Sequence, residues 1–271
     1  MKKEIESKLQ HYHQLWNLTG DGDRYYTHSS LLQPVLYQNK KAMLKIPFSE
    51  EERRGNKLMA WWNGVGSAKV FEWDTNALLM ERIIGDRSLK TMALDNQDNE
   101  ATQIICQVAD LLHADKKNIL PGLTPLTTWF DELFSSADKY GDIIRESSRM
   151  AAILLKRQQN ITILHGDLHH DNVLYSSERG WLAIDPKGLI GERAFDYVNI
   201  LCNPNKETAL AEGRLTREID VISQHTGINR RYLLEWTVAW AGLSSVWFLN
   251  DNQDGSLPMD VARLALKELN N

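Results

Sequence analysis

One segment constrains the fold of this chain more than any other: NITILHGDLHHDNVLYSSERGWLAIDPKG, at residues 160–188. Apolar runs rich in strand-forming residues stand on both sides of the polar loop HGDLHHDN (165–172), and a further run ends at an aspartate. Such runs predict short strands, with a hairpin after the loop. The surrounding sequence has helical periodicity, so these strands must hold the polar loop within a mostly helical body.

Helical periods fill most of the remaining C-terminal part. The predicted helices cover 99–116, 125–137, 140–158, 194–202, about 206–225, 229–249 and 257–270. The N-terminal part differs, because a helix at 1–18 is followed by several short strands. Its other predicted elements are the strands PVLYQ and KAMLKI, joined by Asn39 and Lys40, a helix at 49–62 capped by Ser49, and the strands SAKVFEW and NALLMERI.

We therefore predict an α+β fold with a small strand-rich lobe at residues 1–83 and a larger, mainly helical lobe at residues 84–271. A chain of 271 residues is long enough for two lobes. No linker rich in Pro, Gly and Ser separates them. We therefore expect the lobes to pack against each other with a cleft between them.

Charge and apolar pattern argue against two kinds of partner. A net charge of −5 is unlike nucleic-acid binders, which usually carry a basic surface. The N-terminus lacks the apolar core of a signal peptide, and no apolar run approaches the roughly 20 residues of a membrane-spanning helix. Cys106 and Cys202 are isolated in the sequence, which favours buried free thiols. We therefore expect a cytoplasmic protein without a nucleic-acid or membrane partner.

The loop HGDLHHDN is compatible with two kinds of chemistry. His165, Asp167, His169 and His170 are residue types that bind zinc in metal hydrolases. A zinc site also needs ligands from other loops, yet the remaining histidines stand in helical or N-terminal stretches without a second cluster. The sequence therefore disfavours a metal hydrolase.

Phosphoryl transfer is the alternative, and it needs a carboxylate near the attacking hydroxyl, oxygen ligands for magnesium and a lysine for the phosphates. Asp167 precedes Asn172 by five residues, the spacing of base and metal ligand in a kinase catalytic loop. Asp185 follows the next hairpin, where a second metal ligand is expected. Upstream, Lys45 lies in a predicted strand, and one glutamate of 50–52 is expected to pair with it. Five elements in the correct order predict a phosphoryl-transfer site.

With these residues the chain resembles the aminoglycoside phosphotransferase family, and within it the aminoglycoside/hydroxyurea antibiotic resistance kinases, a branch that includes streptomycin 6-phosphotransferases. The motifs that carry the resemblance are HGDLHHDNVL, GWLAIDPKGLIGERAFD, WWNGVGSAKV and ALLMERI, and it extends from about residue 25 to about residue 250. The resemblance implies a protein-kinase-like fold of two lobes. The N-terminal lobe would bind nucleotide, and the C-terminal lobe would hold the catalytic loop and the acceptor.

The resemblance also implies roles for the site residues. Asp167 would orient the acceptor hydroxyl and accept its proton. Asn172 and Asp185 would hold Mg²⁺ against the phosphates of ATP. Lys45, positioned by Glu52, would contact the α- and β-phosphates.

Further residues take their implied roles from the same resemblance. The backbone of MERI would bind adenine through the Glu81 carbonyl and the Ile83 amide, and Asp196 would brace the catalytic loop. The glycine-rich phosphate loop of kinases is missing, since HSSLLQPVLYQNKK contains no glycine. Ser29 and Ser30 in this stretch either donate to phosphate or belong to a turn.

Five residues near the motif keep open assignments. We expect His165 to pack and hydrogen-bond within the loop, and His169 and His170 to support the structure around it. Lys187 faces either phosphate or solvent. Glu192 either contacts the substrate or caps a helix.

These observations predict an ATP-dependent kinase that phosphorylates a hydroxyl of a small cationic acceptor, with streptomycin as the leading candidate. Another aminocyclitol, hydroxyurea, a sugar or an amino alcohol remain alternatives, because the transferring machinery does not specify the acceptor. A non-catalytic nucleotide-binding regulatory module is a further alternative, against which the intact catalytic set argues. A cationic acceptor needs a carboxylate-lined cleft. The acidic candidates in the helical lobe are Asp131, Glu132, Glu192, Asp251, Asp254 and Glu268.

Overall fold

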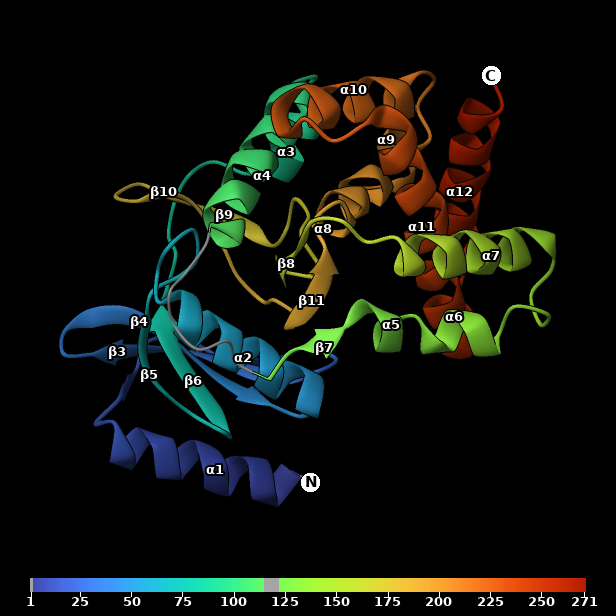
Figure 1. The fold of residues 1–271 in the computed structure, drawn as a ribbon. Helices are drawn as coiled ribbons and strands as arrows, with labels where there is room; N and C mark the ends of the chain where they lie inside the picture. The colour runs from blue at the N-terminus through green and yellow to red at the C-terminus, as the bar shows by residue number, and fades with distance from the viewer. Residues whose placement is uncertain (1, 115–121) are drawn as a thin grey trace.

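The computed structural model describes residues 2–114 and 122–271. Its N-terminal part contains a six-stranded sheet with the order β1-β3-β4-β6-β5, in which β2 also pairs with β3. The elements are α1 (Lys2–Leu15), β1 (Thr19–Gly20), β2 (Tyr25–Tyr26), β3 (Ser30–Tyr37), β4 (Lys40–Pro47), α2 (Glu50–Trp62), β5 (Val70–Asp74) and β6 (Ala77–Glu81). Figure 1 shows α1 along the outer side of this sheet and α2 on the side of the helical part.

The hairpin between β3 and β4 turns one residue earlier than predicted. Gln38 and Asn39, not Asn39 and Lys40, form the turn, and their φ angles are +50° and +63°. Two consecutive positive φ angles belong to the turn type whose twist matches that of paired strands. Lys40 already belongs to β4, where it pairs with Tyr37.

Side-chain alternation along β4 positions one residue of the predicted site. Ala42, Leu44 and Ile46 are buried in a core that they share with residues of α1. Successive side chains of a strand point to opposite faces, so Lys45 projects from the other face. There it meets Glu52 of α2.

Helix α2 begins at the predicted cap and passes close to the segment that follows β10. The Ser49 hydroxyl accepts a hydrogen bond from the Glu52 N–H at 3.2 Å, which satisfies one free donor of the first turn. One turn further along, a Cβ on Gly55 would overlap the carbonyl oxygen of Pro186. Only glycine therefore lets the helix approach this backbone so closely.

The C-terminal part is mainly helical, and strands surround the polar loop. Its helices are α3 (Leu89–Leu94), α4 (Asp98–His113), α5 (Leu126–Trp129), α6 (Asp131–Ser135), α7 (Asp142–Lys156), α8 (Phe195–Val198), the 3-10 helix η1 (Asn199–Cys202), α9 (Lys206–Ala209), α10 (Arg214–Thr226), α11 (Arg230–Asn250) and α12 (Ser256–Leu269). Its strands are β7 (Thr124–Pro125), β8 (Ile161–Leu164), β9 (Val173–Ser176), β10 (Gly180–Ala183) and β11 (Leu189–Glu192). β9 and β10 form the predicted hairpin, and β11 lies between β7 and β8.

Several short elements depart from the prediction. The helix predicted at 125–137 is divided into α5 and α6, and that at 206–225 into α9 and α10, which are separated at Gly213 with φ +71°. The prediction missed α3, β1, β2, β7 and β11, since two to six residues carry too little periodicity to be recognised. The last two residues of the helix predicted at 99–116 lie outside the described residues.

Two hydrophobic cores hold the molecule together. The smaller one lies between α1 and the sheet, and the larger one joins α2 and the inner face of β6 to the helical part. Cys106 and Cys202 are buried free thiols, as predicted. The strand-rich and helical parts are confirmed, whereas the boundary at residue 83 stays a prediction. Within the described part of the chain, no helix has the length and apolar character to cross a membrane.

Candidate active site

The polar loop HGDLHHDN follows β8 and is held by Asp196 of α8. The two Asp196 carboxylate oxygens accept the backbone N–H groups of His165, at 2.8 Å, and Gly166, at 2.7 Å. Asp196 is buried, and its Oδ2 also lies 2.8 Å from His113 Nε2. These bonds confirm the predicted brace. Gly166 has φ +85°, and a Cβ there would lie 2.7 Å from Leu189 Cδ1, so the turn requires glycine.

His165 supports the loop internally, as predicted. Its Nε2 donates to the Ile184 carbonyl at 2.8 Å, and its Nδ1 accepts the Asp167 N–H at 3.2 Å. Both bonds together require the neutral ring. Burial lowers the pKa of His165, which favours that form, and the ring stacks on Trp62 with centroids 6.1 Å apart.

The other two loop histidines point in different directions. His169 Nε2 lies 3.8 Å from Asp167 Oδ1, whereas His170 Nε2 lies 3.9 Å from Asp98 Oδ1 of α4. His170 is buried, and this burial lowers its pKa to about 3. The loop histidines therefore do not converge on a shared point. No group of three or more His, Cys, Asp or Glu in the described ranges is placed to hold a metal.

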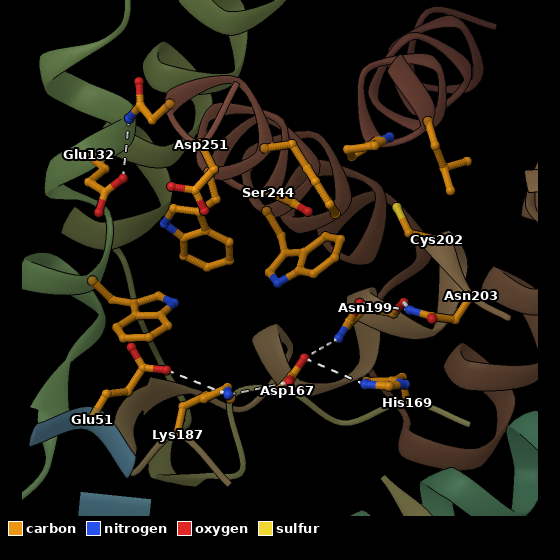
Figure 2. A pocket seen from close by; sticks show the side chains of 18 of the residues that line it. Glu51, Glu132, Asp167, His169, Lys187, Asn199, Cys202, Asn203, Ser244 and Asp251 are labelled. Carbon is orange, nitrogen blue, oxygen red and sulfur yellow. Dashed lines mark hydrogen bonds and ion pairs between the residues drawn. The ribbon is translucent and has the colours of Figure 1, made fainter. Parts of the chain in front are cut away.

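Two amide side chains orient the carboxylate of Asp167. Asn199 Nδ2 donates to Asp167 Oδ1 at 2.8 Å (Figure 2). Asn172 Nδ2 donates to the Asp167 carbonyl at 2.8 Å and lies 3.3 Å from Oδ2. Asn203 Nδ2 in turn donates to Asn199 Oδ1 at 3.0 Å, which determines the orientation of the Asn199 amide. The structure thus brings Asp167 and Asn172 together. It also shows that Asn199 and Asn203 hold the Asp167 carboxylate through successive hydrogen bonds.

Sequence reasoning missed Asn199 and Asn203. Asn199 is the first residue of η1, within the helix predicted at 194–202, and Asn203 is the residue directly after that helix. The available signal was Asn199 itself, a polar residue between the apolar residues Val198 and Ile200. A buried amide needs a hydrogen-bonding partner, and Asn199 is 5% exposed. The sequence alone does not reveal that this partner is the loop aspartate.

Lys45 pairs with Glu52, as expected, and it also contacts Asp185. Lys45 Nζ makes ion pairs with Glu52 Oε2 and with Asp185 Oδ1. Lys45 and Glu52 are buried, so water screens this pair little. Ser29 Oγ and Ser30 Oγ donate to the Glu52 carboxylate at 2.9 and 3.1 Å. Of the three candidate glutamates, Glu52 is therefore the partner of Lys45, and both serines help to hold it.

Asp185 and Asn172 stand at the same end of the β9–β10 hairpin, where Mg²⁺ is predicted. The Ile184 N–H, directly before Asp185, donates to the Asn172 carbonyl at 3.0 Å. Asp185 has φ +61°, a left-handed conformation that is uncommon for residues other than glycine. Burial acts to raise the pKa of Asp185, but Lys45 and Lys187 outweigh it and keep the pKa below its ordinary value. An ionised carboxylate and an amide oxygen fit Mg²⁺, although this assignment stays a prediction.

The predicted adenine contacts lie at the end of β6. The Glu81 carboxylate makes an ion pair with Arg179 of the β9–β10 turn, and it accepts the Lys69 N–H at 2.7 Å. Because these contacts occupy the side chain, Glu81 can contact an adenine ring only through its backbone. The adenine assignment of Glu81 and Ile83 stays a prediction.

Glu192 takes neither of its two predicted roles. It is buried, and its Oε2 accepts the N–H groups of Gln159, at 2.7 Å, and Asn160, at 3.1 Å. The Tyr232 hydroxyl donates to the same oxygen at 3.1 Å. Glu192 therefore stabilises the turn before β8, because its carboxylate accepts two backbone N–H groups of that turn.

A cavity of about 870 Å³ opens beside Asp167 on the side of the helical part (Figure 2). It is lined by three tryptophans, Trp129, Trp240 and Trp247, and by three of the predicted acidic candidates, Asp131, Glu132 and Asp251. Glu192, Asp254 and Glu268 are not among its lining residues. The volume suits a drug-sized ligand, and aromatic faces with carboxylates suit a cation.

Known proteins resemble this chain over most of its length. Residues 15–252 match the family model described as aminoglycoside/hydroxyurea antibiotic resistance kinase. The streptomycin 3''-kinase of Klebsiella pneumoniae is 43% identical over 241 residues, which cover 87% of this chain and 90% of that protein. The streptomycin 6-kinase of Streptomyces griseus is 27% identical over 263 residues, which cover 91% of this chain and 84% of that protein.

Solved structures share the fold at low identity. A thermostable mutant of the aminoglycoside phosphotransferase APH(4)-Ia, in complex with ADP and hygromycin B, has a TM-score of 0.68 at 12% identity and covers 95% of this chain and 97% of its own. A choline/ethanolamine kinase family protein from Mesorhizobium loti also has a TM-score of 0.68, at 17% identity, with coverages of 99% and 94%. The predicted protein-kinase-like fold is thus confirmed. The chain belongs to the aminoglycoside/hydroxyurea antibiotic resistance kinase family and is an ATP-dependent phosphotransferase that acts on an alcohol group.

Proposed function

We propose that this kinase transfers the γ-phosphoryl group of ATP to a hydroxyl of streptomycin, with Mg²⁺ as the metal. One observation carries the proposal: Asp167 stands at a cavity whose wall combines tryptophans with further carboxylates. Streptomycin carries guanidinium groups and an amine, so such a wall matches it in charge and size. The identities of 43% and 27% to streptomycin kinases support the same acceptor.

We assign the transfer to the 3''-hydroxyl. The relative at 43% identity is a 3''-kinase, whereas the two 6-kinases are each 27% identical to this chain. The catalytic loop is common to kinases of either position, so the hydroxyl that reacts depends on how the cavity orients the acceptor. The higher identity to the 3''-kinase, over 87% of this chain, therefore favours the 3'' position.

In the proposed reaction Asp167 aligns the acceptor hydroxyl and accepts its proton while the oxygen attacks the γ-phosphorus. Asn199 and Asn172 keep the carboxylate in its orientation. Lys45, held by Glu52, contacts the α- and β-phosphates. The transition state of phosphoryl transfer is loose, so positioning and charge stabilisation supply most of the acceleration.

Asn172 and Asp185 would hold Mg²⁺, which offsets negative charge on the phosphates when it is bound. Asn172 uses its Nδ2 on Asp167, so its Oδ1 is the atom that it offers to a cation. Adenine would lie at the end of β6, against the Glu81 carbonyl and the Ile83 amide.

Replacement of Asp167 by asparagine tests the proton acceptor. Asp167→Asn keeps the size of the side chain but removes its basicity, so we expect kcat to fall by about 10²–10⁴-fold. ATP affinity should stay within about twofold, because Asp167 faces the acceptor and not the nucleotide. Steady-state rates and calorimetric titration with ATP measure the two effects. Turnover at the wild-type rate would refute the assignment.

Mass spectrometry of reactions with magnesium-ATP tests the acceptor. The panel contains streptomycin, other aminoglycosides, hydroxyurea and simple sugars, and we expect the mass of one phosphate to be gained fastest on streptomycin. NMR of the product then locates the phosphate, for which we expect the 3'' position. Phosphorylation of hydroxyurea alone would contradict the acceptor, and a phosphate at the 6 position would contradict only the position. No gain on any compound would contradict the proposed function.

A further inference from the structure

Lys187 stands two residues after Asp185, in a segment held between the catalytic loop and α2. Its N–H donates to the His165 carbonyl at 2.7 Å. The carbonyl of the preceding Pro186 packs against α2 at Gly55, where no Cβ would fit. These contacts anchor the backbone on both sides, and the Lys187 side chain is only 18% exposed. Lys187 therefore belongs to the junction of the two parts of the molecule and not to the solvent surface.

The Lys187 ammonium lies among three carboxylates. Its Nζ is 3.7 Å from Asp167 Oδ2, 3.5 Å from Glu51 Oε1 and 3.6 Å from Glu52 Oε1. Figure 2 shows the side chain between Glu51 and Asp167. Each distance exceeds the roughly 2.7–3.2 Å of an N–H···O hydrogen bond. The ammonium is thus attracted to all three carboxylates without a close bond to any of them, and its N–H groups can turn toward a nearer acceptor.

Lys187 remains charged at neutral pH. The ordinary pKa of a lysine side chain, about 10.4, lies well above neutral, and the carboxylates of Asp167, Glu51 and Glu52 all lie within 4 Å of the ammonium. A lysine in this state cannot act as a base near pH 7. What it supplies to the site is therefore a fixed positive charge.

This charge lies between the residues assigned to the acceptor and those assigned to the nucleotide. Lys187 and Asp167 both line the acceptor cavity, whereas Lys45 and Asp185, the nucleotide-side residues, do not. Lys187 Nζ nevertheless reaches Glu52, the partner of Lys45. Lys187 thus stands between the nucleotide side and the acceptor side of the site.

In kinases the backbone of a glycine-rich loop covers the phosphates of the nucleotide. Without that loop, another group must donate hydrogen bonds to the γ-phosphoryl group. The turn between β2 and β3, residues 27–29, contains no glycine, and the hydroxyls of Ser29 and of Ser30 at the start of β3 donate to Glu52. In the loose transition state, negative charge is spread over the non-bridging oxygens of the phosphoryl group. A cation that is already in place in a partly water-excluded site stabilises this charge at no cost of reorganisation.

We propose that Lys187 is a catalytic residue that binds the γ-phosphoryl group during its transfer, an inference that rests on the proposed function. The acceptor oxygen forms the new bond to phosphorus, and the bond from the γ-phosphorus to the bridging oxygen breaks. The electron pair of that bond leaves with ADP, and Asp167 takes the hydroxyl proton. Lys187 keeps its own proton and exchanges its neighbours Glu51 and Glu52 for phosphoryl oxygens.

Three variants test this role by kinetics. We expect Lys187→Met to lower kcat by about 10²–10³-fold, the usual loss when one stabilising donor is removed. KM for streptomycin should change by less than about threefold, because the ground-state contacts of the acceptor remain. Lys187→Arg, which keeps the charge, should recover at least a tenth of the wild-type kcat. Lys57→Met removes the same charge from an exposed site on α2 and should match the wild type.

A binding experiment separates catalysis from a merely structural role. Calorimetry of wild type and Lys187→Met with ADP should give equal affinities. With streptomycin, ADP and aluminium fluoride, which mimics the transferring phosphoryl group, the variant should bind about 100-fold more weakly. Melting temperatures verify that each variant is folded, and Lys187→Gln replaces the methionine variant if that one is not.

Equal affinity of wild type and variant for the aluminium fluoride complex would overturn the proposal, because Lys187 would then only position its neighbours. If the wild-type enzyme phosphorylates aminoglycosides and Lys187→Met has the same kcat, the role of Lys187 would be refuted. The proposed function would then still stand. A wild-type enzyme that phosphorylates no aminoglycoside would refute the proposed function, and this inference with it.

Discussion

Among single residues, Asn199 donates a shorter hydrogen bond to the Asp167 carboxylate than Asn172 does. The amide of Asn199 holds Oδ1 at 2.8 Å and is itself held by Asn203 at 3.0 Å. Both asparagines line the acceptor cavity, whereas Lys45 does not. Asn199 therefore acts on the side of the acceptor hydroxyl, where a small rotation of the carboxylate changes its alignment with the attacking oxygen.

Asn199→Ala should separate this positioning from nucleotide binding. We expect kcat to fall by about 10–100-fold, because the carboxylate gains freedom to rotate away from the hydroxyl. ADP affinity, measured by calorimetry, should stay unchanged. Asn203→Ala removes the two hydrogen bonds of Asn203 to Asn199 and should cost less than Asn199→Ala. A larger loss in the Asn203 variant would contradict this order of support.

Among the elements, α2 carries Glu51 and Glu52 to the junction between the two parts of the molecule. Its approach depends on Gly55, which lies against the Pro186 carbonyl. Alanine at this position would favour the helix by about 1 kcal/mol in isolation. Its Cβ, however, would overlap a backbone oxygen, and no side-chain rotation can relieve that overlap. Steric repulsion therefore outweighs the gain in propensity.

Gly55→Ala should therefore impair both stability and catalysis. We expect the free energy of unfolding to fall by about 1–3 kcal/mol, the usual cost of overpacking. kcat/KM should fall at least about tenfold, because α2 must move and carry Glu52 away from Lys45. Gly122→Ala is the matched control, since no atom of the described residues lies within 4 Å of its added Cβ. Urea unfolding and steady-state kinetics measure both effects, and equal behaviour of the two variants would contradict the argument.

Across the whole molecule, a buried charged cluster connects α4, α10 and the catalytic loop. Arg214 of α10 is 1% exposed, and its Nε lies 2.6 Å from Asp98 Oδ2 at the start of α4. Glu218, one turn after Arg214, is fully buried, and His170 of the loop lies beside Asp98. Burial first, and then Asp98, raises the pKa of Glu218 to about 7.

This cluster makes stability depend on pH. Glu218 stays protonated in the native state while the unfolded chain loses the proton, so its contribution to stability is present below about pH 4.5 and lost as pH rises to about 7. Glu218→Gln removes that loss, because glutamine does not titrate. Between pH 5 and 8 the free energy of unfolding of the variant should therefore rise by roughly 2 kcal/mol relative to that of the wild type. His170, whose pKa is lowered to about 3, acts in the opposite direction in both proteins. Urea unfolding at several pH values measures the difference, and parallel curves would contradict it.

Local spacing explains why much of the site could be predicted. Asp167 and Asn172 lie within one loop, and Asp185 follows a hairpin whose register places it beside Asn172. Lys45 is placed by strand alternation, and Glu52 follows a recognisable helix cap. In each case a few residues of known periodicity determine the direction of the side chain.

The order of the elements, the catalytic loop and the lysine–glutamate–aspartate set can thus be obtained from the amino-acid pattern, because they depend on short-range geometry. The folded arrangement was needed to show that Asn199 holds Asp167, that Glu192 closes a turn, and that Lys187 stands among three carboxylates. It was also needed to show which acidic residues line the acceptor cavity. These outcomes depend on segments that are distant in the chain and on the faces by which helices pack, and the sequence pattern of one helix does not specify its neighbours.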